Sequence, residues 1–153
     1  MKKLTTALLL ASLTFLPLQS GIASPDSRPA HGKQQRPEIA EQVKAWQGEE
    51  GTEVWILRYG PREENKALVQ LVNIDHPWNR KIQIMDVVRE NKKKKYTVTL
   101  NGNRFVVLSM DGTNIGELYL PNEPHPYRIS YSDLLSKYGN AQHFLTDYLS
   151  QQK

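Results

Sequence analysis

Residues 65–84 read NKALVQLVNIDHPWNRKIQI, and the other candidate strands of the chain can be aligned on either side of this stretch. Its first part, ALVQLVNI at residues 67–74, places apolar side chains on both faces of an extended strand, because successive side chains alternate between faces. Such a run predicts an interior strand that is covered, at least in part, on both sides. A buried helix is the alternative for a short apolar run, but the β-branched residues favour a strand.

A short polar and aromatic loop, DHPWNR at residues 75–80, follows this strand, and the next residues, KIQI, alternate as a half-buried strand. The proline disfavours helical backbone at the residue before it, and Asp and Asn side chains bond to nearby amides in turns. An acid, an imidazole, an indole and a guanidinium therefore lie between two strands. This loop is the best candidate for a recognition site, and its candidate binding residues are Asp75, His76, Trp78, Asn79 and Arg80.

Trp78 admits two interpretations, which the sequence leaves open. It is either an aromatic anchor in a polar surround, a composition enriched at binding hot spots, or a plug folded back on one end of the sheet. His125 is the remaining candidate binding residue, because the prolines on both sides of it restrict the backbone and present it rigidly.

Alternating apolar residues predict further strands on both sides of the central stretch. They cover residues 52–59, 81–90, 96–100, 104–110, 115–120 and 127–131. Asn101-Gly102 is the strongest turn signal, because both residue types tolerate the positive φ of a type I′ hairpin. Gly116 within its strand is typical of a β-bulge.

A helix is predicted over residues 37–47, before the first strand. Pro37 is acceptable at the first helical position, and Ile39, Val43 and Trp46 fall on one stripe of such a helix. Trp46 is expected in the core.

Two short helices are predicted after the last strand, with Ser132 and Asn140 as their N-caps. The fold class expected from these elements is α+β. It consists of an antiparallel meander sheet of about six strands, one N-terminal helix and two short C-terminal helices.

The first 23 residues have the three parts of a secretory signal peptide. Lys2 and Lys3 precede an apolar run, and Gly21 and Ala23 are the small residues of a cleavage site after Ala23. The run is too short to span a bilayer comfortably, so a membrane anchor is the weaker alternative and no integral membrane segment is expected after signal removal. The signal predicts export to the periplasm.

Residues 24–36 carry no apolar residue larger than Ala and Pro and are expected to form a flexible tail. Residues 37–153 are then expected to form a single globular domain. The chain has no cysteine, which excludes disulfides, thiolate zinc sites and thiol catalysis. Removal of two lysines with the signal lowers the formal net charge from +4 to +2, so the charge of the full chain overstates the case for a polyanionic partner.

A run of four lysines is expected in a hairpin turn, and its members are Lys92, Lys93, Lys94 and Lys95. One interpretation is a patch that binds an acidic surface such as lipopolysaccharide. The favoured interpretation is a solvated turn whose charges blunt a sheet edge. No aromatic residue is interleaved with the lysines, and nucleic acid is not expected as a partner.

The chain lacks a nucleophile elbow, a zinc-protease helix motif, a phosphate-cradling glycine loop and a dinucleotide fingerprint. We therefore expect a small exported, non-catalytic protein that binds another protein or an envelope component. One alternative is a small periplasmic hydrolase centred on His76 and His125, and another is an accessory subunit of an envelope assembly. No cofactor is expected, and a metal held by the two histidines and Asp75 is disfavoured. The sequence leaves the partner and the oligomeric state open.

Overall fold

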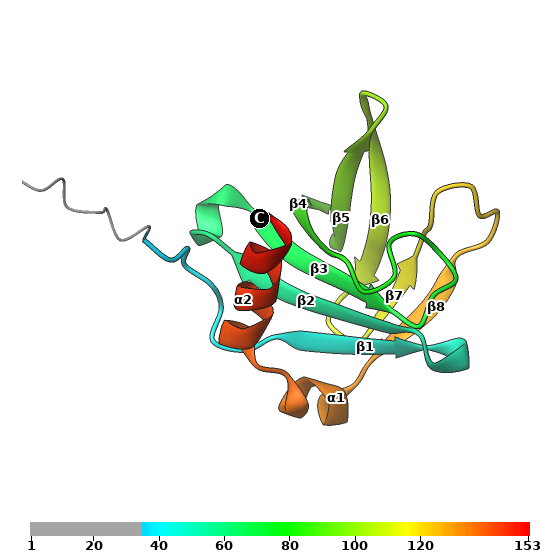
Figure 1. Ribbon diagram of the computed structural model, residues 1–153. Coiled ribbons are helices and arrows are strands. Elements are labelled where there is room, and N and C mark those ends of the chain that lie inside the picture. The colour runs from blue at the N-terminus through cyan, green and yellow to red at the C-terminus, as the bar shows by residue number, and fades with distance from the viewer. Residues whose placement is uncertain (1–34) are drawn as a thin grey trace, which may run out of the picture. The chain divides into compact units, whose positions relative to one another are not determined.

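Eight antiparallel strands, each paired with the next in sequence, close into a barrel in the computed structural model, which describes residues 35–153 (Figure 1). The strands are β1 (Lys44–Gly48), β2 (Glu53–Tyr59), β3 (Lys66–Val72), β4 (Ile82–Glu90), β5 (Lys93–Leu100), β6 (Asn103–Asp111), β7 (Ile115–Leu118) and β8 (Tyr127–Tyr131). The helices are α1 (Asp133–Tyr138) and α2 (Ala141–Gln151), and two 3-10 turns are η1 (Glu49–Gly51) and η2 (Arg62–Glu64). Pairing of β1 with both β2 and β8 closes the barrel.

The α+β class expected from the sequence is wrong, because the structure is a closed eight-stranded barrel instead of a six-stranded meander sheet with an N-terminal helix. The segment expected as a helix over residues 37–47 is irregular up to residue 43 and then forms β1, where Trp46 pairs with Val54 and Tyr131. This pairing removes the two sheet edges that β2 and β8 would otherwise expose. An isolated helix of that length is marginal, so closing the barrel outweighs the helical pattern.

Inward-facing side chains fill most of the barrel, as they can in a barrel of eight strands. The core that they form contains Trp46, Val54, Ile56, Ala67, Val69, Leu71, Ile74, Met85, Tyr96, Val107, Leu108, Met110, Leu118, Leu120 and Ile129. Trp46 is buried, as expected, although it lies on a strand.

Helix α2 covers the outside of the barrel over β2, β3 and β4. Leu57, Leu68 and Ile82 of these strands pack with Phe144 and Leu145 of the helix in a second apolar cluster. Strand β3 is therefore covered on both faces, which confirms the prediction made from its two-sided apolar run.

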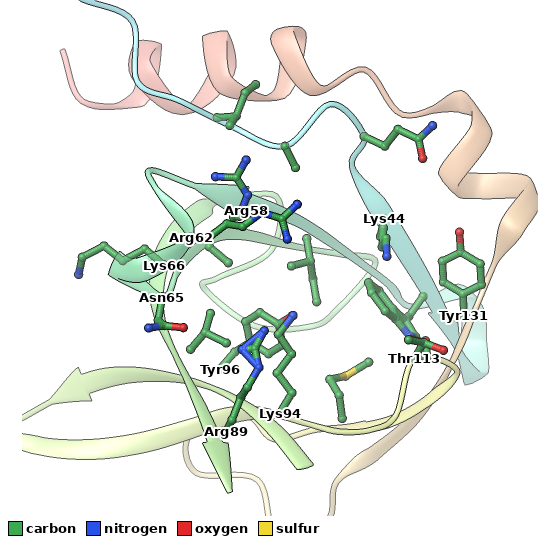
Figure 2. Close-up of a pocket in the computed structure, with 18 of the residues that line it drawn as sticks. Lys44, Arg58, Arg62, Asn65, Lys66, Arg89, Lys94, Tyr96, Thr113 and Tyr131 are labelled. Atoms are coloured by element: carbon green, nitrogen blue, oxygen red, sulfur yellow. Dashed lines mark hydrogen bonds between the residues drawn. The ribbon is translucent and has the colours of Figure 1, made fainter. Parts of the chain in front are cut away.

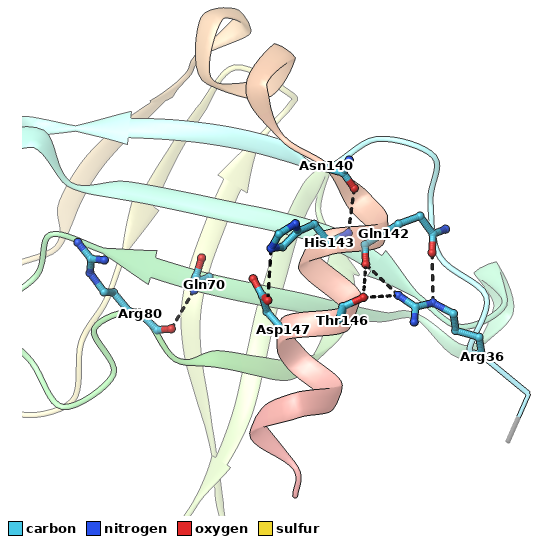
Figure 3. A network of polar contacts seen from close by, with 8 residues as sticks. All are labelled: Arg36, Gln70, Arg80, Asn140, Gln142, His143, Thr146 and Asp147. Carbon is cyan, nitrogen blue, oxygen red and sulfur yellow. Dashed lines mark hydrogen bonds and ion pairs between the residues drawn. The ribbon is translucent and has the colours of Figure 1, made fainter.

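Arg36 ties the stretch before β1 to helix α2 (Figure 3). Its Nη2 donates hydrogen bonds to the carbonyl oxygen of Gln142 at 2.9 Å and to Oγ1 of Thr146 at 2.6 Å. Further along the same stretch, Ile39 forms an isolated antiparallel bridge with Tyr59 at the end of β2. These contacts lead residues 36–43 past one end of the barrel.

The two C-terminal helices are present as expected, and both caps are confirmed. Ser132 Oγ accepts a hydrogen bond from the Leu135 amide at 3.2 Å, and Asn140 Oδ1 accepts one from the His143 amide at 2.8 Å. Among residues 35–153, no helix is long and apolar enough to cross a membrane.

The Asn101-Gly102 turn between β5 and β6 is confirmed, with φ values of 49° and 79°. A β-bulge lies further along this hairpin, because Tyr96 pairs with Leu108 while Thr97 pairs with Val106, which leaves Val107 unpaired. The bulge is thus in β6 at Val107.

No register shift marks the strand that carries Gly116, where a bulge was expected. Gly116 pairs regularly with Met110, and a Cβ added to this glycine would meet the Met110 sulfur at 2.4 Å. The glycine therefore makes room for a core side chain.

Candidate ligand-binding cavity

The two ends of the barrel differ. At one end, which we call the plugged end, the loop between β3 and β4 packs Trp78 against the core. At the other, the open end, a cavity of about 1200 Å³ extends into the barrel (Figure 2). Buried residues at 0 to 1% exposure, among them Leu71, Leu108 and Ile129, fill the barrel between the two ends.

The inner wall of the cavity is apolar and aromatic. It is formed by side chains that also belong to the barrel core or pack against it, namely Trp46, Ile56, Ala67, Val87, Tyr96 and Met110. The indole nitrogen of Trp46 donates to the carbonyl oxygen of Thr113 at 3.2 Å, which holds the ring against the wall.

A ring of basic side chains surrounds this apolar wall. Each lies on a strand two residues from an inward-facing apolar residue, toward the open end, so strand alternation directs it to the cavity as well. We call these four residues the basic ring, and they are Lys44, Arg58, Arg89 and Lys94. Figure 2 shows side chains of this ring directed toward the cavity from opposite walls, with Arg62 of η2 beside them.

Only part of this positive charge is neutralised. Arg58 Nη1 lies 3.0 Å from Glu38 Oε1, and Lys66 at the margin of the cavity lies 2.9 Å from Asp86 Oδ1. Lys44, Arg89 and Lys94 have no salt bridge to any acid within residues 35–153. Six basic residues but only two acidic ones, Glu38 and Glu41, line the cavity. The open end is therefore strongly positive.

The surroundings of Lys94 destabilise the charged form of its ammonium group. Burial lowers its pKa first, because an apolar wall disfavours the charged form, and the charges of Arg89 and Lys44 lower it further. Its Nζ lies 5.4 Å from the centre of the Tyr96 ring, which supplies a cation–π contact. Burial also raises the pKa of Tyr96 to about 12. Tyr96 is buried and Lys94 is half-buried, so both side chains are largely withdrawn from water at the inner wall.

A bound anion would relieve the repulsion among these cations. Charge-assisted hydrogen bonds to an anion are among the stronger polar interactions in proteins, and the apolar wall behind them can accept a hydrocarbon group. The mouth of a barrel is also a common position for ligand sites. The arrangement is thus suited to a ligand that is anionic at one end and apolar at the other.

The loop expected to be the recognition site is instead held together mainly by its own backbone. The amide of Trp78 donates to His76 Nδ1 at 3.2 Å, and the Asn79 amide donates to the His76 carbonyl oxygen at 2.9 Å. The Arg80 amide donates to the Leu71 carbonyl oxygen at 2.7 Å, which ties the loop to β3. The loop therefore has a defined conformation.

The Trp78 indole faces the barrel. Its ring centre lies 5.1 Å from that of His76 and 6.4 Å from that of Phe105, both edge to face, and the ring packs on the main core. Half-buried in this position, Trp78 has the geometry of a plug.

The other predicted site residues lie at the surface. Asp75, Asn79, Arg80 and His125 are exposed. Asn79 Oδ1 accepts from the amide of Ile74 at 3.4 Å, which is a structural role. The Arg80 carbonyl oxygen accepts from Gln70 Nε2 at 2.8 Å, so it is the backbone of Arg80 that is held to β3 (Figure 3).

The two histidines of the hydrolase alternative are not joined to catalytic partners. Within residues 35–153, neither His76 nor His125 hydrogen-bonds the side chain of an acid, serine or threonine, and no group of three or more His, Asp or Glu residues is placed to hold a metal. The structure thus brings His76 and Trp78 together but forms no constellation around His125.

Sequence analysis missed the basic ring because its members are spread over residues 44–94 and share no motif. The sequence does contain a signal, because each basic residue of the ring is two positions from an apolar or aromatic residue. The pairs are Lys44 and Trp46, Arg58 and Ile56, Arg89 and Val87, and Lys94 and Tyr96. This pattern becomes informative only once the strands are known to close into a barrel. Lys94 also illustrates the limit of treating the four lysines as a turn, since it lies in β5 and faces inward.

No protein-family model, curated protein or solved structure matches the chain. The cavity and its side chains are therefore the only guide to function within residues 35–153.

Proposed function

We propose that the chain is an exported, non-catalytic binding protein that holds an anionic amphiphile of the cell envelope at the open end of its barrel. One observation carries the proposal. Lys44, Arg89 and Lys94, without acidic partners in residues 35–153, converge on a cavity whose inner wall is apolar. Export, predicted from the N-terminal sequence, would bring the protein to envelope lipids and their breakdown products.

The basic ring favours a ligand with an anionic group. Three like charges around one cavity repel each other. Burial lowers the pKa of Lys94, and the charges of Arg89 and Lys44 lower it further. An anion converts the repulsion into attraction, and a site with low-dielectric walls focuses the positive field on it. A phosphate monoester or a carboxylate satisfies this requirement, whereas a cation does not.

The cavity wall favours a ligand with an apolar group as well. Trp46, Ile56 and Met110 offer hydrocarbon and aromatic surface beyond the cations. Each methylene group of a ligand that is buried there contributes about 0.8 kcal/mol. A chain of several methylenes therefore adds as much affinity as the anionic group, and an amphiphile should bind better than a free anion.

The proposal is tested by calorimetric titration of the protein with three probes below their micelle-forming concentrations. Dodecyl phosphate carries both features, inorganic phosphate carries only the anion, and dodecyl maltoside carries only the chain. We expect dodecyl phosphate to bind at least tenfold more tightly than either of the others and to lose affinity as salt is raised. Equal binding of dodecyl phosphate and dodecyl maltoside would contradict an anion site.

Neighbouring lysines of β5 provide matched variants. Lys94 lines the cavity and Lys93 is exposed, yet Lys94→Gln and Lys93→Gln remove the same charge from the same strand. A charge-assisted hydrogen bond contributes about 1.5–3 kcal/mol, so Lys94→Gln should weaken dodecyl phosphate binding about tenfold or more. Lys93→Gln should change it less than twofold. Equal losses for the two variants would show that net charge alone, and not the cavity, attracts the probe.

A further inference from the structure

Strands β4 and β5 are paired along only part of their length. Their pairing runs from Glu90 and Lys93 to Asp86 and Thr97 and then stops. Beyond that point, residues 82–85 of β4 pair only with β3, and residues 98–100 of β5 pair only with β6. A gap therefore opens in the barrel wall between two strands that are neighbours elsewhere.

The β-bulge in β6 lies where the gap begins. Val107 is the unpaired residue between the Tyr96 and Thr97 pairs, and Thr97 is also the last residue of β5 that pairs with β4. A bulge bends its strand and increases the local twist. The end of the β5–β6 hairpin accordingly stands away from the barrel (Figure 1).

The edge of β4 along this gap presents backbone amides. The Val87 amide donates to the Asn65 carbonyl oxygen on the β3 side, and successive amides of a strand point to opposite edges. The amides of Ile82 and Ile84 therefore point to the gap. The Ile82 amide donates to Oε1 of Gln151 at 3.1 Å, a side-chain oxygen from α2 in the position that a strand carbonyl would take.

Two further observations show that the gap is accessible and polar. The side chain of Ile84 on its rim is 39% exposed, although it is a large apolar residue in a strand. The Nε2 atom of Gln83, which lines the gap, is buried and has no hydrogen-bond partner among residues 35–153. A cavity of about 430 Å³ occupies this place, with Thr99 of β5 and Tyr148 of α2 on its other sides.

We propose that this gap is a slot for an extended segment of another polypeptide, which adds as a strand beside β4. Residues 82–85 have no strand partner on this side, where a side chain of α2 bonds only the Ile82 amide. An extended peptide matches a strand edge of this kind better than a small molecule does. Residues 82–85 offer an edge of about 13 Å, enough for a segment of about four residues. Neutral side chains line most of the slot, so a peptide with small polar and apolar residues in alternation fits it.

A second copy of this chain is a poorer occupant. Every strand of the closed barrel is paired on both sides over at least part of its length. The described part of a folded copy, residues 35–153, therefore has no long free strand to insert, other than the edges of its own slot. The slot and the cavity at the open end share only Lys66 among their lining residues, and the proposal does not rest on the anionic ligand.

The test uses a probe peptide with the sequence of residues 96–100, acetyl-YTVTL-amide, whose alternation is that of the natural neighbour of β4. Amide hydrogen exchange followed by NMR should show Ile84 exchanging rapidly in the free protein and at least tenfold more slowly with saturating peptide. The same peptide N-methylated at alternate residues loses its donors on one edge and should give less than twofold protection. Equal protection by both peptides, or an Ile84 amide already protected in the free protein, would overturn the proposal.

Substitutions at one position separate pairing from side-chain packing. Ile84→Pro removes the amide hydrogen that faces the slot. It removes no amide of the β3–β4 ladder, and proline is tolerated at such edge positions of a sheet. It should weaken peptide binding at least tenfold, whereas Ile84→Val should change it less than twofold. Should Ile84→Pro fail to fold, the N-methylated peptide decides alone.

Two further measurements distinguish this site from the alternatives. Lys94→Gln should leave peptide binding unchanged, because Lys94 lines the other cavity. Protection of Ile84 that rises with protein concentration in the absence of peptide would assign the slot to a second copy and overturn the proposal.

Discussion

Lys94 is a residue at which the proposed anion binding and the stability of the fold oppose each other. Its ammonium group is half-buried, faces the charges of Arg89 and Lys44, and has a pKa below its usual value of 10.5. The proton is thus held less tightly in the folded state than in the unfolded state. The position of Lys94 therefore lowers the stability of the folded state, and a bound anion would offset this loss.

The first prediction follows from that linkage. Lys94→Met should raise the free energy of unfolding at pH 7 by about 0.5–1 kcal/mol while weakening the binding of dodecyl phosphate. Because the unfolded state binds more protons between the lowered pKa and 10.5, the contribution of Lys94 to stability improves as pH rises through that window. The advantage of Lys94→Met should therefore shrink toward pH 10.5 in a series of urea titrations. An advantage that grows with pH would contradict this assignment.

The second prediction concerns Trp78. The ring packs against Phe105 and the barrel core at the plugged end, so Trp78→Ala should lower the free energy of unfolding by about 2 kcal/mol or more. Dodecyl phosphate binding at the open end should be unchanged in the folded fraction. His76→Ala removes only one edge-to-face neighbour and serves as the milder control. Undiminished stability in urea unfolding would return Trp78 to the role of an exposed anchor.

Among the elements, the β5–β6 hairpin tests how local turn chemistry supports the fold. Gly102 has a φ of +79° and open space around the position of a Cβ, so a substitution there acts through the backbone alone. Gly102→Val should cost about 1 kcal/mol or more, because β-branched residues rarely adopt positive φ. Gly102→Asn should cost less, since asparagine tolerates this region. Thermal melting of both variants checks the order, and equal losses would refute the backbone explanation.

Local signals of this kind explain what could be predicted from the sequence. The turn at Asn101, the caps at Ser132 and Asn140 and the two-sided strand β3 each depend on residues close together in the chain. Their physical causes act within a few residues. For that reason they hold whether the sheet is open or closed.

The segment before β2 shows why the rest could not be predicted. Val43 and Trp46 share one stripe of a helix, but in the structure Val43 joins the cluster under α2 and Trp46 lies inside the barrel. Both faces of β1 carry apolar side chains at these positions. The alternation of apolar and polar residues that marks a strand is therefore absent from the sequence. The deciding interaction is the pairing of β1 with β8, which lies more than eighty residues away in the sequence. No local sequence pattern predicts this pairing.

For the whole molecule, the same closure explains the missed site. The basic ring consists of residues from four strands that meet only because the barrel closes. The loop at residues 75–80 was predicted as the recognition site because its polar groups are adjacent in sequence. The density of polar residues along the sequence is a poor guide to binding sites in a barrel, because the residues at one end of a barrel come from many strands.

Export is the prediction at the scale of the whole chain, and it concerns residues outside the part that the structure describes. The Lys2-Lys3 start, the apolar run and the small residues before Ser24 predict cleavage after Ala23. N-terminal sequencing of the protein from a periplasmic fraction should begin at Ser24. Recovery only from the cytoplasm, with Met1 retained, would remove the localisation and the envelope ligand with it.

The unequal ends of the barrel have a kinetic consequence. The proposed ligand at the open end would have a packed core behind it, from Leu71 and Leu108 to the Trp78 plug, so its arrival and departure would use the same route. A second ligand cannot push the first one out from behind, and exchange must wait for spontaneous release. If the chain binds the proposed ligand, any donor or acceptor of that ligand would therefore have to approach the open end itself. Orientation of that end toward the donor or acceptor would then limit the rate of transfer.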